Sequence, residues 1–286
     1  MTERLADISA RIESVGQLGA VVNAMKGIAA ARAHTARTQL EAVDSYAATI
    51  AAVMSSALGP EAAPSRAPRS SAGKATQAKT GLLVFCAEQG FAGAFSERVL
   101  DSIDVEPDAK TLFLVGTRGL ALAAVRGIVP VWSAAMPSHT PGIPKLADRI
   151  TTAIYNLVGA GNIDRLDVIF TEQKSGRPTV RRQTLFPIDM SNLPAPAFEN
   201  PLMQLPVGAL IDSLGADYFH ALVCRTALHA FAAENDARLE AMSAAGSQIA
   251  RELETFQATL RRVRQEAITA EIIELGTGAA AARDER

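Results

Sequence analysis

The fold is decided by residues 239–263, which read LEAMSAAGSQIARELETFQATLRRV. Apolar or small side chains recur there in alternating steps of three and four, and the rhythm continues to residue 270. Such a heptad pattern is typical of a helix that packs along its length against another helix. The residues of this C-terminal seam are Leu239, Met242, Gly246, Ile249, Leu253, Phe256, Leu260, Val263, Ala267 and Ala270.

A second seam occupies the first part of the chain, where residues 5–58 contain no proline. A helix over residues 5–58 is about 80 Å long at about 1.5 Å per residue, so something must pack along most of it. We therefore predict that the two ends of the chain pair as an antiparallel coiled coil. The residues of this N-terminal seam are Ile8, Ile12, Val15, Gly19, Val22, Lys26, Ala29, Ala33, Ala36, Leu40, Val43, Ala47, Ile50 and Met54.

Lys26 is the one charged residue of the N-terminal seam. A lysine in a seam lowers stability but can fix the register or indicate a further partner. The alternative is that its aliphatic stem leaves the seam and carries the ammonium group into water. Both interpretations stay open at the level of sequence.

The middle of the chain alternates between strand and helix patterns. This alternation predicts a mainly parallel sheet with right-handed crossovers, a Rossmann-like α/β head at one end of the coiled coil. The overall fold class is thus α/β with a long coiled coil. The expected strands are 81–86, 111–115, 128–132, 166–170 and 179–186, and the expected helices are 92–100, 117–125 and 145–158.

Four segments follow from these patterns. Residues 1–58 form an N-terminal coiled-coil helix, and residues 59–79, rich in Ala, Pro, Ser and basic side chains, form a flexible linker. Residues 80–206 form the head, and residues 207–286 form a C-terminal coiled-coil helix. The basic side chains of the linker are interpreted as solvated rather than as a binding site.

Composition excludes several classes of protein. The chain has 286 residues, is 48% hydrophobic and 20% charged, and carries a formal net charge of -2, which argues against nucleic acid as a partner. No apolar run approaches the roughly 20 residues that span a bilayer, so we expect a chain of the cytoplasm. Cys86 and Cys224 are far apart and fit buried free thiols.

Catalytic, cofactor and metal sites find no support in the sequence, and we expect none. Gly90 and Gly93 follow the first strand, where phosphate-binding turns occur, but their spacing matches neither G-x-G-x-x-G nor the P-loop. A tight strand-to-helix turn explains them better. The four histidines form no metal-ligand pattern, and no nucleophile elbow or placed Cys/His pair is found.

Three motifs together resemble the gamma subunit of the F-type rotary ATP synthase, the central shaft of that complex. Residues 264–274, RQEAITAEIIE, with Gly-Ala-Ala at 278–280, are similar to the family's C-terminal signature. Residues 11–15, RIESV, and 24–32, AMKGIAAAR, resemble its opening, and residues 234–242, ENDARLEAM, resemble a further stretch. The resemblance covers the whole chain.

The resemblance implies a non-catalytic rotor subunit that couples ion flow, of protons or sodium, to ATP synthesis. Its paired helices would form an axle inside a ring of three alpha and three beta subunits. The head would lie against the epsilon subunit and the c ring, so that contact with the membrane is only through the complex. For a bacterial complex this implies the cytoplasmic face of the inner membrane.

The resemblance also assigns contacts. Arg264 and Gln265 would hydrogen-bond to a loop of the catalytic beta subunit, while Ile268 and Ile272 would turn in an apolar bearing. The crowding of polar residues from Arg261 to Glu266 near the end of the helix is consistent with a partner there.

Met25 and Lys26 match the family's N-terminal motif and are expected to meet the ring near the same level. The loop at 90–96 departs from the family's G-L-C-G-x-x-N, and residues 244–248 replace a polar run, which indicates a divergent branch. Two other functions remain as alternatives: a nucleotide-binding α/β protein with coiled-coil dimerisation ends, and a coiled-coil scaffold.

Overall fold

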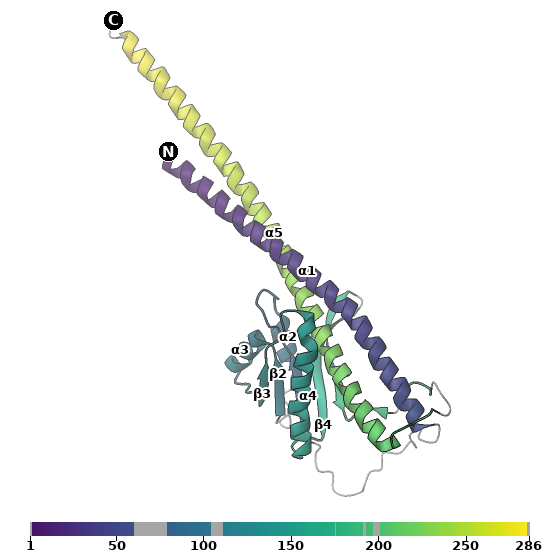
Figure 1. Ribbon diagram of the computed structural model, residues 1–286. Helices are drawn as coiled ribbons and strands as arrows, with labels where there is room; N and C mark the ends of the chain where they lie inside the picture. The colour runs from purple at the N-terminus through teal and green to yellow at the C-terminus, as the bar shows by residue number, and fades with distance from the viewer. Residues whose placement is uncertain are drawn as a thin grey trace. The chain divides into compact units, whose positions relative to one another are not determined.

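The computed structural model describes residues 2–59, 79–103, 111–174, 176–190, 193–196 and 201–284 (Figure 1). The linker expected over 59–79 lies almost entirely outside these residues. The chain divides into two compact units, each described by itself below. The coiled-coil unit comprises Met1–Ile28 and Leu239–Arg286, and the α/β unit comprises Ala29–Arg238.

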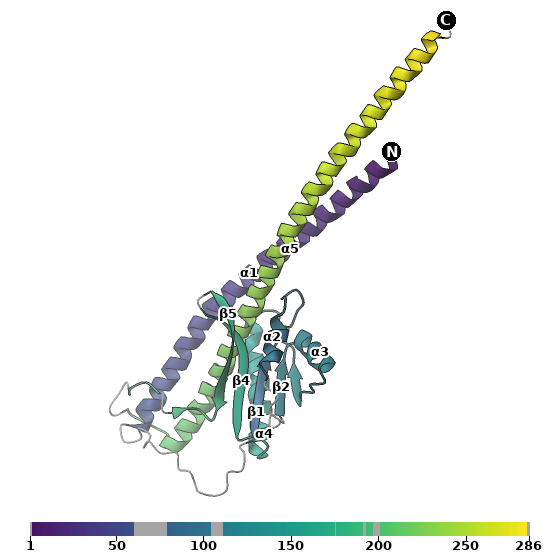
Figure 2. The ribbon, with the colours of Figure 1, turned by 180° about the vertical axis from the view of Figure 1, so that it is seen from behind.

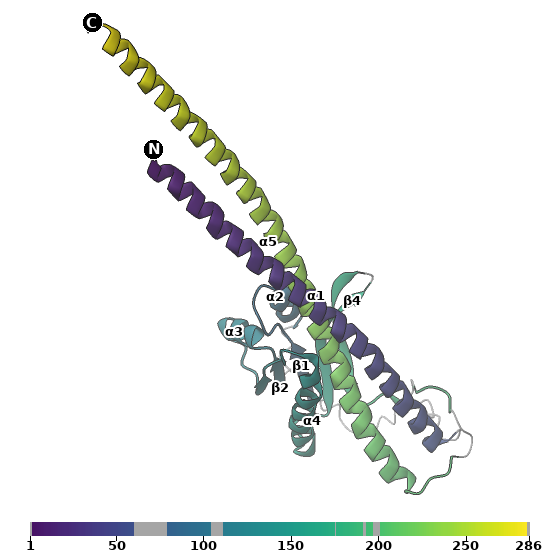
Figure 3. The same ribbon diagram turned by 45° about the horizontal axis from the view of Figure 1, so that its top comes forward.

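The coiled-coil unit is built from parts of two long helices, α1 (Thr2–Leu58) and α5 (Val207–Asp284). The helices are antiparallel, since a Cβ atom at Gly19 would lie 3.2 Å from Cγ2 of Ile249, and one at Gly246 would lie 3.9 Å from Cγ1 of Val22. Val22, Met242 and Ile249 form the buried centre of the contact. Figure 3 shows the two helices side by side in this unit, with α5 continuing past the start of α1.

Both predicted seams are confirmed by burial, with one correction. Every predicted residue of the C-terminal seam is buried or half-buried, and so is every residue of the N-terminal seam except Lys26. Lys26 is exposed, and Met25 takes the inward position and packs on the cluster around Val22. The seam steps by three from Val22 to Met25 and by four to Ala29, which removes the need to bury an ammonium group.

The α/β unit is built on a five-stranded sheet in the order β3-β2-β1-β4-β5 (Figure 2). Neighbouring strands from β3 to β4 are parallel and β5 is antiparallel to β4, so the expected mainly parallel sheet is confirmed. The strands are β1 (Thr80–Phe85), β2 (Thr111–Val115), β3 (Trp132–Ala134), β4 (Arg165–Lys174) and β5 (Arg177–Phe186).

Strand β1 is central because both of its faces are apolar, as expected for a parallel strand covered on both sides. Leu83 and Phe85 face one cluster, and Leu82 and Val84 face the other. The first cluster is closed by α4 (Ile143–Gly159) and by residues of α5, and the second by α2 (Phe95–Asp101) and α3 (Thr117–Val125). A short 3-10 helix, Thr140–Gly142, leads into α4.

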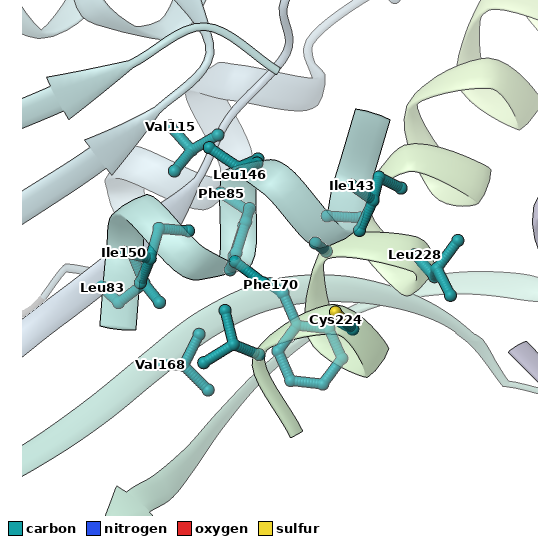
Figure 4. Packing of buried hydrophobic residues seen from close by; sticks show 14 of the residues in the cluster. Leu83, Phe85, Val115, Ile143, Leu146, Ile150, Val168, Phe170, Cys224 and Leu228 are labelled. Carbon is teal, nitrogen blue, oxygen red and sulfur yellow. The ribbon is translucent and has the colours of Figure 1, made fainter. Parts of the chain in front are cut away.

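The first cluster explains why α4 and the first half of α5 are helical at these positions. The buried residues of α4 recur at helical spacing, which places them on one face, as Figure 4 shows for Ile143, Leu146 and Ile150 opposite Phe85. Part of α5 is long and apolar enough to cross a membrane by length and composition alone. Of that apolar stretch 22% is buried, and Val223 and Leu228 of α5 are among the residues that pack in this core.

Two expected elements begin later than predicted. The strand expected at 128–132 is found at Trp132–Ala134, because Val129 is 85% exposed and Val131 makes a single backbone bond, from its N–H to the carbonyl of Leu112, rather than a ladder. The helix expected at 92–100 begins at Phe95, after a turn in which Gly93 has a φ of 55°. The β-branched residues at 128–131 favour a strand by composition, but they lie before the ladder of β3.

Candidate functional site

Four of the expected contact residues lie on one face of α5. With 3.6 residues per turn, Arg264, Gln265, Ile268 and Ile272 fall within about 100° of one another around the helix axis. All four side chains are exposed, Ile268 by 57% and Ile272 by 63%. We call this set, continued by the exposed Leu275, the C-terminal stripe. Large apolar side chains gathered in one exposed row are typical of a surface that a partner covers.

α1 overlaps the level of Arg264 and Gln265 but ends before Ile268, Ile272 and Leu275 of the C-terminal stripe. Residues 19 and 22 face residues 249 and 246, so Thr2 lies at the level of about residue 266, since both helices rise equally per residue. The part of α5 from about residue 267 to residue 284 therefore continues alone over about 27 Å. The seam pattern persists to Ala270, beyond the partner that explains the rest of it.

Met25 and Lys26 are not at the level of the stripe, which corrects that expectation. Met25 packs on the cluster of Val22, Met242 and Ile249. Arg264 is 22 residues beyond Met242, about 33 Å along the helix. Lys26 lies instead at a groove of about 530 Å³ between the helices, lined mainly by small and polar residues, among them Gly19, Asn23, Gly246 and Ser247.

A buried polar network, missed at the level of sequence, occupies the α/β unit where α5 passes the carboxyl end of the sheet. Glu234 and Arg238 lie one turn apart on α5 and form an ion pair of 2.5 Å, with side chains only 4% and 6% exposed. The backbone N–H groups of Glu88 and Gln89 each donate to Glu234 at 3.1 Å. Arg238 donates to the carbonyl oxygens of Gln89 at 3.3 Å and Gly90 at 3.1 Å.

The network extends through the side chain of Glu88. Its carboxylate accepts the backbone N–H of Thr117 at 2.9 Å and that of Met136 at 2.8 Å. Thr117 begins α3, so the negative charge of Glu88 sits at a helix N-terminus, where it is stabilised. The loops that follow β1, β2 and β3 are thereby joined.

This arrangement also bears on nucleotide binding. In parallel α/β sheets a phosphate binds at a helix N-terminus beside the carboxyl ends of the strands. At α3 that place is taken by the carboxylate of Glu88, which repels an anion. A nearby pocket of about 290 Å³, lined by Gly90, Phe91 and Arg118 among others, has none of the spacing of a phosphate loop.

The structure does bring one Cys/His pair together. Sγ of Cys224 lies 3.8 Å from Nδ1 of His220, and Nε2 of His220 lies 3.1 Å from Oδ1 of Asp148. These are the residue types of a nucleophilic triad, and the spacing of four along a helix was the available signal. Burial, and then Asp148, raise the pKa of Cys224 to about 11, so the thiol is not an active nucleophile at neutral pH.

Cys86 is equally inert. Both cysteines are free and buried, as expected, and burial is the main cause that raises the pKa of Cys86 to about 12. In the part of the chain that the structure describes, no group of three or more His, Cys, Asp or Glu residues is placed to hold a metal ion.

The two paired helices and the α/β unit define a class of protein, an α/β domain joined to a long helical shaft. Comparison with known proteins makes this specific. The ATP synthase family model matches residues 4–282. The ATP synthase gamma chain of Pelodictyon phaeoclathratiforme is 28% identical over 96% of this chain and 97% of its own length. That of Moorella thermoacetica is 27% identical over 96% and 98%.

Solved structures agree in fold. A chain of the Euglena gracilis mitochondrial ATP synthase, from a structure of OSCP, F1 and c-ring, aligns over 100% of this chain and 97% of its own with a TM-score of 0.65 and 14% identity. A chain of the Tetrahymena thermophila central stalk and c-ring aligns over 79% and 99%, with a TM-score of 0.57 and 18% identity. The chain belongs to the ATP synthase gamma-chain family, and its function is that of a gamma subunit in a rotary ATP synthase.

Proposed function

We propose that this gamma subunit is non-catalytic and acts by contact, with the C-terminal stripe as the surface that the catalytic ring touches. The observation that carries the proposal is the exposed row from Arg264 to Leu275, which continues onto the part of α5 that extends beyond α1. Arg264 and Gln265 offer hydrogen-bond donors to a loop of the beta subunit. Ile268 and Ile272 offer an apolar surface on which a collar of alpha and beta subunits can turn.

The mechanism follows from asymmetry. Arg264 and Gln265 occupy one side of the helix, so in a ring of three alpha and three beta subunits they face one beta subunit at a time. Each contact favours one conformation of that subunit, and rotation moves the preference to the next. The α/β unit would lie with the epsilon subunit and the c ring, at the cytoplasmic face of the membrane in a bacterium, so that ion flow turns the shaft.

Met25 and Lys26 are proposed as a second, separate contact. The exposed ammonium group of Lys26 sits about 33 Å from Arg264 along the shaft, so it would meet the ring at another level. An acidic segment of a ring subunit is the partner that its charge fits.

The test is reconstitution with alpha, beta and the membrane sector. The variant Arg264→Ala/Gln265→Ala is expected to lower ATP synthesis at least about twofold, as mutations along coupled networks do. The matched control is Arg262→Ala/Glu266→Ala, which removes an exposed pair at the same level whose mean direction around the helix differs by about 130° from that of Arg264 and Gln265. Equal rates in the two double variants would refute the proposed role of the stripe.

The nucleotide-binding alternative has no observation in its favour and is tested separately. Calorimetric titration of the isolated chain with ATP and NAD should give no heat of binding, whereas saturable heat from either would revive it.

A further inference from the structure

The buried polar network of the α/β unit has a mechanical role that its stability alone does not require. We propose that Glu88, Glu234, Asn235 and Arg238, together called the clamp, are positioning residues that carry torque between α5 and the sheet. The inference goes beyond the stripe and rests on the rotor function. It concerns how α5 is held, not which subunit its end touches.

The clamp grips one short loop from one turn of α5. Glu234 accepts two backbone N–H groups of the loop at 88–90, and Arg238 donates to two of its carbonyl oxygens. Donors and acceptors thus alternate across the contact, and all four bonds involve a charged side chain, the stronger kind of hydrogen bond. Asn235 fixes the guanidinium, which donates to its Oδ1 at 3.1 Å.

These hydrogen bonds resist rotation of α5, which apolar packing alone does not. Apart from a bond between Gln173 of β4 and Asp236, the contact between α5 and the sheet described above is made by small and apolar residues, among them Val223, Ala227 and Leu228. Burial of apolar area resists separation, but it is non-directional. Hydrogen bonds weaken steeply as their angles fall, so a turn of α5 about its own axis would break the four bonds to the loop together.

Further hydrogen bonds connect the clamp to the other strands of the sheet. The carboxylate of Glu88 ties the gripped loop to Thr117 and Met136, which follow β2 and β3. On the other side of the same turn, Asp236 forms an ion pair with Arg37 of α1 and accepts a bond of 3.2 Å from Gln173 of β4. One turn of α5 is therefore bonded to α1, to β4 and to the loop after β1, and Glu88 links that loop to the loops after β2 and β3.

Stability gives no sufficient reason for such a cluster. A buried ion pair contributes little net stability compared with apolar residues of similar volume, although removing one partner alone is strongly destabilising. Directional strength under load is the property that apolar residues cannot supply. This contrast makes the clamp testable apart from folding.

The experiment uses the reconstituted complex. The variant Glu234→Leu/Arg238→Met replaces the pair by apolar residues, which keeps the core filled while removing all four bonds to the loop. A probe is attached through a single introduced cysteine, Val129→Cys, at a residue 85% exposed in the α/β unit, because both native thiols are buried. Angular fluctuation of the probe is recorded between steps, and ions pumped per ATP hydrolysed are measured in vesicles.

We expect the angular variance to rise at least about twofold and pumping per ATP to fall, with ATP hydrolysis itself maintained. Wild-type variance and pumping ratio in the assembled variant would overturn the proposal. If the double variant does not assemble, Glu88→Gln decides in the same way, since it loosens the tie to Thr117 and Met136 without touching the buried pair.

The matched control is Arg225→Ala, which removes an ion pair of 2.9 Å between α5 and Asp44 of α1. Its side chains are 42% and 44% exposed, so little change is expected. An equal rise in variance for this control would also overturn the clamp. Failure of the rotor function is distinguished by the wild-type chain, which would then fail to support pumping at all.

Discussion

Two positions of the α/β unit, Gly116 and Gly119, have no room for a Cβ atom. A Cβ atom at Gly119 of α3 would lie 2.0 Å from Cβ of Cys86, and one at Gly116 would lie 2.5 Å from the carbonyl oxygen of Cys86. Gly116 also has a φ of 109°, which side chains rarely adopt. α3 can approach the end of β1 only because both residues are glycine.

Gly119→Ala is therefore expected to destabilise the α/β unit by about 1–3 kcal/mol through overpacking. Gly27→Ala is the matched control, because Gly27 is also helical but nothing lies within 4 Å of its Cβ position. The control should be neutral or stabilise by up to about 1 kcal/mol. Urea denaturation followed by circular dichroism measures both, and equal effects would contradict this explanation.

At the scale of elements, the hairpin of β4 and β5 is fixed by one buried carboxylate. Asp167 accepts hydrogen bonds from Arg165 at 2.9 Å, Arg182 at 3.0 Å and Thr184 at 2.9 Å. Burial alone would raise the pKa of Asp167, but these three hydrogen bonds outweigh it and hold the pKa below the ordinary 3.8. The charged form is thus the one that the fold stabilises.

Asp167→Asn is expected to lower the free energy of unfolding by about 1–3 kcal/mol at neutral pH. The stabilisation by Asp167 is fully present above the unfolded pKa and is lost as pH falls through the lower folded pKa. The variant should therefore lose less stability than the wild type between about pH 5 and pH 2. Denaturation across that range checks the slope, and parallel curves for the two proteins would contradict the assignment.

The sequence predicts well those elements whose apolar residues follow a single regular spacing. Both seams follow from spacing alone, and β1 follows from an apolar run. The prediction that Lys26 occupies the seam is wrong. Met25 and Lys26 both fit the spacing, and the packing around Val22 places Met25 inside. The clamp could not be predicted, since Glu88 and Glu234 are 146 positions apart and meet only through the fold. The motif at 234–242 and the charges inside the apolar run at 230–238 single out these residues, but neither indicates that they bind the loop at 88–90.

At the scale of the whole molecule, the function is predicted from sequence motifs and not from the geometry of a site. The stripe residues were named by resemblance, and their shared face follows from helical spacing. Their separation from Met25 and Lys26 needed the register of the coiled coil, which neither seam alone provides. Periodicity says that two helices pair, but not which levels meet.

The solitary end of α5 has a measurable consequence. Residues beyond about 267 lack the packing that stabilises the rest of the helix, and most helical stability in proteins comes from such packing rather than from intrinsic propensity. Backbone amides of residues 268–277 should exchange with solvent faster than those of 242–256 in the isolated chain, and slow down in the assembled complex. Mass spectrometry of exchange measures this, and equal protection in the isolated chain would contradict it.

Under the proposed function, the end of α5 becomes rigid when the subunits around it hold it in place. The region where α1 and α5 pair is stiff because two helices pack along it. The single helix beyond it is straight and ordered to the extent that surrounding subunits support it. Under the proposed function, assembly of the ring around α5 would therefore also supply the stiffness of its end, because the part beyond residue 267 has no support from α1.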